Sequence, residues 1–85
     1  MINCMFICLG LLENPPYLKK DGVAEFNIIY SSNGKRTVVC CQAVGEIGKQ
    51  ITLFGNKGSF WAIKGIVHKM GRHTDIVKVY QVEKI

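Results

Sequence analysis

The segment EIGKQITLF, residues 46–54, decides the fold because it interrupts a chain that otherwise has the pattern of strands. Its Ile47, Ile51 and Phe54 follow the i, i+4, i+7 spacing of a short amphipathic helix. On both sides of it, apolar runs rich in β-branched and aromatic residues are typical of strands. These runs are residues 4–12, 23–30 and 36–44 before the helix and residues 59–69 and 75–83 after it.

Three strands, a short helix and two further strands follow one another in the order of the OB barrel. We therefore predict an all-β fold, a five-stranded OB-fold barrel with a short helix between strands 3 and 4. Turn residues keep the connections short, and no repeat, low-complexity segment or linker divides the sequence. The 85 residues are enough for one modest hydrophobic core, so we expect residues 1–85 to form a single OB-fold domain.

The pair Asn33-Gly34 fixes the register of strands 2 and 3. As a two-residue primed turn it places Ser32 opposite Lys35, and every later pair follows. One face of the hairpin is then almost wholly apolar and is expected to be core, with the pairs Tyr30–Thr37, Ile28–Val39, Phe26–Cys41 and Ala24–Ala43. The other face carries Ser31–Arg36, Ile29–Val38, Asn27–Cys40, Glu25–Gln42 and Val23–Val44. This mixed face suits contact with a polar ligand, and it equally fits an ordinary solvated sheet face.

Strand 4 places two large aromatic groups side by side. Neighbouring side chains in a strand point to opposite faces, so Phe60 and Trp61 cannot both be core. We expect Trp61 inside with Ile63, and Phe60 outside with Lys64 and His68. The alternative is that Phe60, at the start of the strand, tucks under the preceding loop.

Strand 1 is apolar on both of its faces. One face carries Met5, Ile7, Leu9 and Leu11, and the other carries Cys4, Phe6 and Cys8. A strand that is apolar on both sides in so small a barrel indicates that one side packs on another subunit. We therefore expect a homodimer or homotetramer assembled through strand 1.

The balance of charge suits a polyanionic partner, and it equally fits a protein that is kept soluble by its charge. Eleven Lys and Arg against six Asp and Glu give a net charge of +5. The cations collect in the predicted loops, with Lys19 and Lys20 between strands 1 and 2, Lys35 and Arg36 at the hairpin of strands 2 and 3, and Lys69, Arg72 and His73 around the turn between strands 4 and 5. The strand 2–3 face and the loops between strands 1–2 and 4–5 are where OB folds hold oligonucleotides.

Other functional classes are disfavoured by the sequence. The apolar run 4–12 is far shorter than the roughly 20 residues that span a bilayer, and it lacks the basic flank of a signal peptide, so we expect a cytoplasmic protein with no membrane contact. The four cysteines lack zinc-site spacing, and we expect them to be small buried hydrophobes, with no metal and no cofactor. We also expect no enzyme activity, because the sequence shows neither a recognisable nucleophile triad nor a glycine-rich phosphate loop.

The chain resembles the bacterial single-stranded DNA-binding protein family, which includes the smaller primosomal replication protein N, in three segments: FICLGLLENPP at 6–16, DGVAEFNIIY at 21–30 and KGSFWAIKGIV at 57–67. This resemblance implies an OB fold and sequence-independent binding of single-stranded DNA in replication, recombination or repair. In the implied alignment the family's stacking aromatics on strand 3 fall on Val38 and Val44, so we expect salt-sensitive binding led by phosphate contacts.

The predicted nucleic-acid-binding residues combine these patterns. We expect Phe60 to stack on a base, the strand face to be lined by Asn27, Gln42, Arg36 and Lys64, and phosphates to be held by Lys19, Lys20, Lys35, Lys69 and Arg72, with His68 nearby. Two alternatives stay open. The barrel could be a protein-interaction subunit of a primosome-like replication complex, docking through Ile29, Val38, Val44 and Ile66, or it could bind single-stranded RNA. Docking through an aliphatic patch would be insensitive to salt, whereas nucleic-acid binding would weaken steeply with it.

Overall fold

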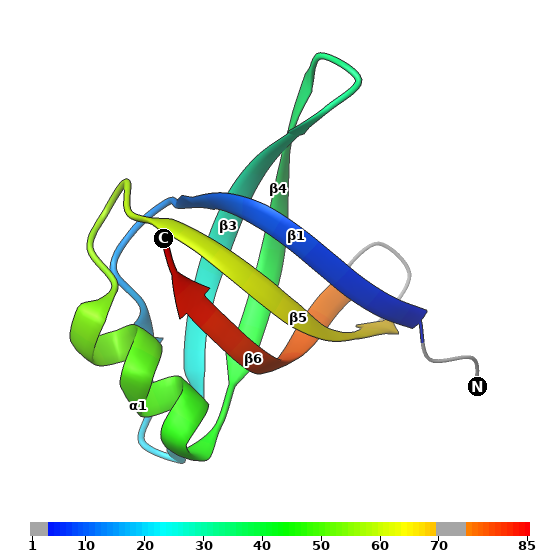
Figure 1. Ribbon diagram of the computed structural model, residues 1–85. Coiled ribbons are helices and arrows are strands. Elements are labelled where there is room, and N and C mark those ends of the chain that lie inside the picture. Colours follow the sequence, from blue (N-terminus) through cyan, green and yellow to red (C-terminus); the bar gives the residue numbers. More distant parts are fainter. Residues whose placement is uncertain (1–3, 70–74) are drawn as a thin grey trace.

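A computed structural model describes residues 4–69 and 75–85. Figure 1 shows the elements in chain order: β1 (Cys4–Leu12), β2 (Tyr17–Leu18), β3 (Ala24–Ser32), β4 (Lys35–Ala43), α1 (Gly45–Phe54), β5 (Phe60–Lys69) and β6 (Asp75–Lys84). The five predicted strands and the helix are confirmed, with ends that differ by at most two residues. The two-residue strand β2 was not predicted, because two residues are too few to show an alternating pattern.

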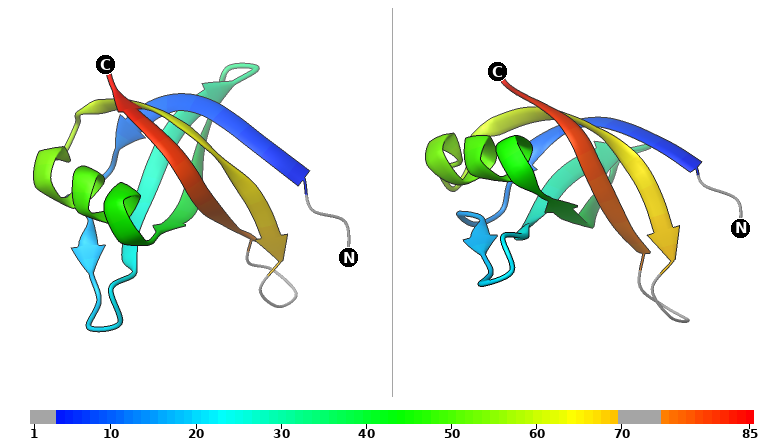
Figure 2. Two further views of the ribbon diagram at one scale, coloured as in Figure 1. Left: turned by 60° about the horizontal axis from the view of Figure 1, so that its bottom comes forward. Right: turned by 90° about the horizontal axis from the view of Figure 1, so that it is seen from below.

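The five long strands close into a barrel. The sheet order is β1-β5-β6-β4-β3-β2, and β1 closes the barrel by also pairing with β3 through Leu11↔Ile29 and Leu12↔Ile28. The paired strands are antiparallel except β4 and β6, which run parallel. The β3–β4 hairpin extends beyond one end of the barrel, and α1 lies toward the other end (Figures 1 and 2). This is the predicted OB fold.

The register of the β3–β4 hairpin is the one that the turn predicts. Every pair from Ser32↔Lys35 to Ala24↔Ala43 is present. Asn33 and Gly34 have φ angles of 52° and 76°, as a primed turn requires. The prediction of one further pair is wrong at Val44, because β4 ends at Ala43 and Val44 is already the residue that precedes α1.

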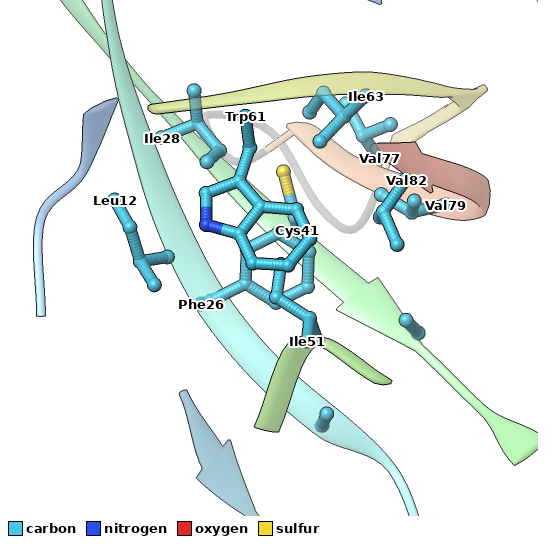
Figure 3. Packing of buried hydrophobic residues seen from close by; sticks show 12 residues of the cluster. Leu12, Phe26, Ile28, Cys41, Ile51, Trp61, Ile63, Val77, Val79 and Val82 are labelled. Carbon is cyan, nitrogen blue, oxygen red and sulfur yellow. The ribbon is translucent and has the colours of Figure 1, made fainter. Parts of the chain in front are cut away.

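Trp61 is the largest side chain of the core and is fully buried. Figure 3 shows its indole among Phe26, Ile28, Cys41 and other side chains of the barrel interior. The indole Nε1 donates a hydrogen bond to Ser59 Oγ at 2.8 Å, which satisfies its one polar atom. The prediction that Trp61 is core is therefore confirmed.

Helix α1 closes the core through Ile51, which is fully buried. The prediction that Phe54 shares this face is wrong, since 55% of Phe54 is exposed. Leu12 and Pro16 already fill the space beneath the last turn. A Cβ atom added to Gly55 would lie 2.8 Å from Leu12 Cδ2 and 3.1 Å from Pro16 Cδ. Of the three apolar residues that predicted the helix, only Ile47 and Ile51 therefore contact the core.

The outward face of β1 and the first residue of β5 are apolar and exposed. Met5, Ile7, Leu9 and Leu11 are between 42% and 66% exposed, while Phe6 and Cys8 on the other face of β1 pack against the core. Phe60 is 40% exposed, which confirms that it points outward rather than under a loop. In the described part of the chain no helix has the length and apolar character needed to cross a membrane.

Candidate nucleic-acid interface

Three adjoining hollows run along the outer surface of β3 and β4, and we call them together the outer groove. The first, of about 340 Å³, lies over the middle of the hairpin; its surface residues are Asn14, Pro15, Glu25, Asn27, Cys40, Gln42 and Ile76. The second, of about 460 Å³, shares Asn14 with the first and adds Leu11, Glu13, Ile29, Arg36 and Lys57. The third, of about 340 Å³, shares Leu11, Ile29 and Arg36 with the second and adds Leu9, Ser31 and Phe60.

The strand register sets the order of side chains along this groove. From one end to the other, the outward pairs of β3 and β4 are Glu25↔Gln42, Asn27↔Cys40, Ile29↔Val38 and Ser31↔Arg36. The groove therefore changes from polar at its Gln42 end to apolar and cationic at its Phe60 end. All of these positions follow from the turn at Asn33-Gly34, because the register determines which residues share a face.

The Gln42 end is crossed by a chain of polar contacts, which we call the polar chain. Lys78 Nζ donates a hydrogen bond to Gln42 Oε1 at 2.6 Å, and Gln42 Nε2 donates one to Glu25 Oε2 at 2.9 Å. Lys19 Nζ lies 3.9 Å from the same carboxylate oxygen. Each of these side chains already has a partner within the protein, so the polar chain holds the Gln42 amide in a fixed orientation.

A second amide is also held by a carboxylate. Asn27 Nδ2 donates a hydrogen bond to Glu13 Oε1 at 3.1 Å. The backbone brings the two residues together, since the Glu13 N–H donates to the Asn27 carbonyl oxygen at 3.0 Å. Both predicted amides of this face, Asn27 and Gln42, are therefore bonded to acidic side chains.

The Phe60 end carries an apolar row that crosses four strands. Phe60 of β5 is the register partner of Leu11 of β1, Leu11 is the partner of Ile29 of β3, and Ile29 is the partner of Val38 of β4. All four side chains face outward, and Phe60, Leu11 and Val38 are 40% to 49% exposed. We call these four residues the apolar row.

Lys57 stands beside the apolar row because its loop is fastened to the end of β1. The Gly58 N–H donates to the Leu12 carbonyl oxygen, and the Leu12 N–H donates to the Ser59 carbonyl oxygen, each at 2.8 Å. Gly58 has a φ of 82°, which favours glycine, and this conformation lets the loop turn directly into β5. As a result Lys57, in the loop before β5, and Arg36, on β4, line the same hollow.

The structure brings together five of the predicted site residues. Lys19, Asn27, Arg36, Gln42 and Phe60 line or border the outer groove. Lys35 is exposed at the hairpin beside the third hollow, and Lys20 is exposed in the loop that follows β2.

The other predicted residues are not brought to the groove. Lys64 lies on β5 between Ile7 of β1 and Gln81 of β6, so its expected place on the β3–β4 face is wrong. His68 is at the far end of the same strand. Arg72 and the side chain of Lys69 fall outside the described residues.

Sequence reasoning missed Lys57, Lys78 and the two carboxylates of the groove. Lys78 reaches the site because β6 runs parallel to β4 with Gln42↔Lys78 in register, a pairing between distant segments that no local pattern reveals. Lys57 could have been found from the sequence, because in the predicted barrel the loop before the fourth strand lies beside the end of the first strand. Glu25 was predicted on this face but given no role there, and Glu13 was not placed, because no local pattern reveals which amides these two carboxylates contact.

The cysteines show no arrangement for metal binding. The described residues include no group of three or more His, Cys, Asp or Glu side chains placed to hold a metal ion. Burial raises the pKa of the Cys8 thiol to about 11 and raises that of Cys41 as well. The prediction of a small buried hydrophobe is confirmed for Cys41 and is wrong for Cys40, which is exposed on the outer face of β4.

Comparisons with known proteins identify the fold. No protein-family model matches the chain, and no curated protein matches it. Among solved structures, the second single-stranded DNA binding protein (SSBb) from Mycobacterium smegmatis is similar, with a TM-score of 0.86 and 15% identity over 98% of this chain and 89% of that one. The mitochondrial single-stranded DNA binding protein Rim1 from S. cerevisiae has a TM-score of 0.81 and 11% identity over 100% of this chain and 97% of that one. The family resemblance of the sequence is thus confirmed at the level of the fold.

Proposed function

We propose that the protein binds single-stranded DNA in the outer groove, without sequence preference, in replication, recombination or repair. One observation carries the proposal: on an OB barrel, one surface groove is lined by the exposed ring of Phe60, by Leu11 and Ile29 of the apolar row, and by the cations Arg36 and Lys57. Stacking platforms beside cations are the usual means of holding a single strand. The two similar structures described above are themselves single-stranded DNA binding proteins, which supports the same ligand.

The groove assigns different roles to its side chains. Phe60 stacks on a base, a contact worth about 1–3 kcal/mol. Arg36 and Lys35 contact phosphates, and the amide of Asn27 lies under a base. Val38 occupies a position where the family resemblance implies a stacking aromatic, so binding is led by phosphate contacts. The proposed function includes no catalytic step.

Fluorescence anisotropy of a labelled dT oligonucleotide tests this function. We expect saturable binding at micromolar protein that an unlabelled single strand displaces and a duplex of the same length does not. An RNA oligonucleotide of matched sequence, used as a third competitor, decides between DNA and RNA. Absence of binding at low salt would contradict the proposal and favour a docking role for the apolar row.

We also propose that the protein is a homo-oligomer assembled through β1. On the side away from β5, β1 pairs with β3 only at Leu11 and Leu12, so from Cys4 to Gly10 this edge faces no other described strand. The same strand exposes Met5, Ile7 and Leu9. A free edge beside an apolar face favours pairing with a second copy.

Sedimentation velocity of paired variants tests the assembly. Ile7→Lys places a charge in the proposed interface and is expected to shift the protein toward monomer. Leu53→Lys is the matched control, because Leu53 is 75% exposed on α1, whereas Ile7 is 66% exposed on β1. Equal sedimentation of the two variants and the wild type would show that β1 is not the interface.

A further inference from the structure

We propose that the two ends of the outer groove are not equivalent: a dinucleotide step is anchored at the Phe60 end, while the polar chain keeps phosphates away from the Gln42 end. This inference rests on the proposed function and narrows it to a defined subsite. It assigns Lys57 and the apolar row to the ligand, and it gives Glu25, Gln42 and Lys78 a structural role in the protein.

The ionic partners of the cations separate the two ends. At the Gln42 end, Lys19 faces Glu25, and Lys78 donates to Gln42. Across residues 4–69 and 75–85, neither Arg36 nor Lys57 forms an ion pair with a carboxylate. The one carboxylate that borders their hollow, Glu13, already accepts a hydrogen bond from Asn27. A phosphate therefore meets two cations without ion-pair partners at the Phe60 end. At the Gln42 end Lys19 is paired with the Glu25 carboxylate, and the Lys78 ammonium is held by the Gln42 amide oxygen.

The apolar row supplies a surface for bases at the same end. Phe60, Leu11, Ile29 and Val38 are in register across four strands and face outward. Exposed apolar groups placed together beside unpaired cations match a ligand with flat apolar faces and a charged backbone. The position for base stacking is thereby Phe60 at the start of β5, and not Val38 on β4.

Arg36 determines the size of the subsite. It lines both the hollow of about 460 Å³ that contains Lys57 and the hollow of about 340 Å³ that contains Phe60. A guanidinium between two hollows is placed to bind the phosphate that joins two nucleotides, with one base on each side. Lys57 then contacts the next phosphate.

Seven variants, controls included, test this arrangement by anisotropy across a series of salt concentrations. We expect Phe60→Ala to weaken dT binding by about 5- to 150-fold, the equivalent of one lost stacking contact. Tyr80→Ala is its control, since Tyr80 is similarly exposed on β6 and lines none of the three hollows. Phe60→Tyr is expected to retain binding, and circular dichroism verifies that each variant is folded.

The cation variants are compared through the salt dependence of binding. Arg36→Ala and Lys57→Ala should each reduce the slope of log K against log salt concentration by about 0.7, the contribution of one phosphate contact on a single strand. Lys78→Ala and Lys49→Ala should leave the slope unchanged, because Lys78 serves the polar chain and Lys49 lies on α1.

The outcomes separate the subsite from the function. If wild-type protein binds the single strand, and Phe60→Ala and Lys57→Ala bind as tightly as their controls, the subsite is wrong while the function stands. A loss of slope in Lys78→Ala would likewise overturn the assignment of the polar chain. If the wild type does not bind dT at all, the proposed function itself has failed.

Discussion

At the scale of single residues, Trp61 shows how alternation in a strand decides which of two neighbouring aromatics is core. Trp61 is fully buried and its neighbour Phe60 is 40% exposed, as the period of two in a strand requires. Ser59 follows from the same geometry, because it is two residues before Trp61 and its hydroxyl accepts the indole N–H. The sequence was sufficient for this assignment because the pattern is local.

The Ser59–Trp61 hydrogen bond gives the first prediction. Ser59→Ala leaves the buried indole N–H without its partner and should lower the free energy of unfolding by about 1–3 kcal/mol. Trp61→Ala removes the whole side chain from the core and should cost about 3–5 kcal/mol. Urea unfolding followed by circular dichroism measures both, and equal stability of Ser59→Ala and wild type would contradict the role of this bond.

The Cys8 thiol gives a prediction about alkaline stability. Burial raises its pKa in the folded protein to about 11, from an ordinary value of 9.0. Below pH 9 the thiol is protonated in both the folded and the unfolded chain, so its contribution to the free energy of unfolding is complete there. As the pH rises toward 11, the thiol ionises first in the unfolded chain, and the free energy of unfolding falls. The urea midpoint of wild type should therefore decline more steeply between pH 9 and 11 than that of Cys8→Ala. Parallel declines would contradict it.

At the scale of elements, the closure of the barrel depends on the close approach of β1 to β3. A Cβ atom on Gly10 would lie 2.4 Å from Ile28 Cγ2 and 2.5 Å from the Ile29 carbonyl oxygen. Side chains at this position would push the two strands apart just before their pairing at Leu11. The glycine is therefore a requirement of packing.

Gly10→Ala tests this closure. Overpacking at a rigid crossing costs about 1–3 kcal/mol, and we expect that loss in urea unfolding. Ser31→Ala, an exposed substitution on the neighbouring hairpin, is the control and should be close to neutral. Should Gly10→Ala prove as stable as this control, the crossing would be looser than the structure indicates.

The elements also show where sequence reasoning stops. The hairpin register could be predicted from Ser32↔Lys35 to Ala24↔Ala43, because the turn at Asn33 and Gly34 sets which residues are opposite each other, although it does not say where β4 ends. The neighbours of this hairpin could not, since the pairing of Gln42 with Lys78 joins strands that are far apart in the sequence. For that reason Arg36 and Gln42 were assigned to the site, while Lys57 and Lys78 were missed and Lys64 was placed on the wrong face.

At the scale of the whole molecule, the protein combines a net charge of +5 with two exposed apolar surfaces. One surface is the outward side of β1, which we assign to a second copy of the chain. The other is the apolar row beside Arg36 and Lys57, which we assign to single-stranded DNA. Leu11 belongs to both, so assembly and DNA binding meet at the end of β1.

The most direct test of the central claim is the salt dependence of wild-type binding to a labelled dT oligonucleotide. Single-strand binding led by phosphate contacts predicts that log K falls linearly with log salt concentration, with a slope of about −0.7 for each phosphate neutralised. A duplex of equal length should not displace the strand at any salt concentration. Binding that does not change with salt, or no binding at low salt, would contradict the claim that this groove holds single-stranded DNA.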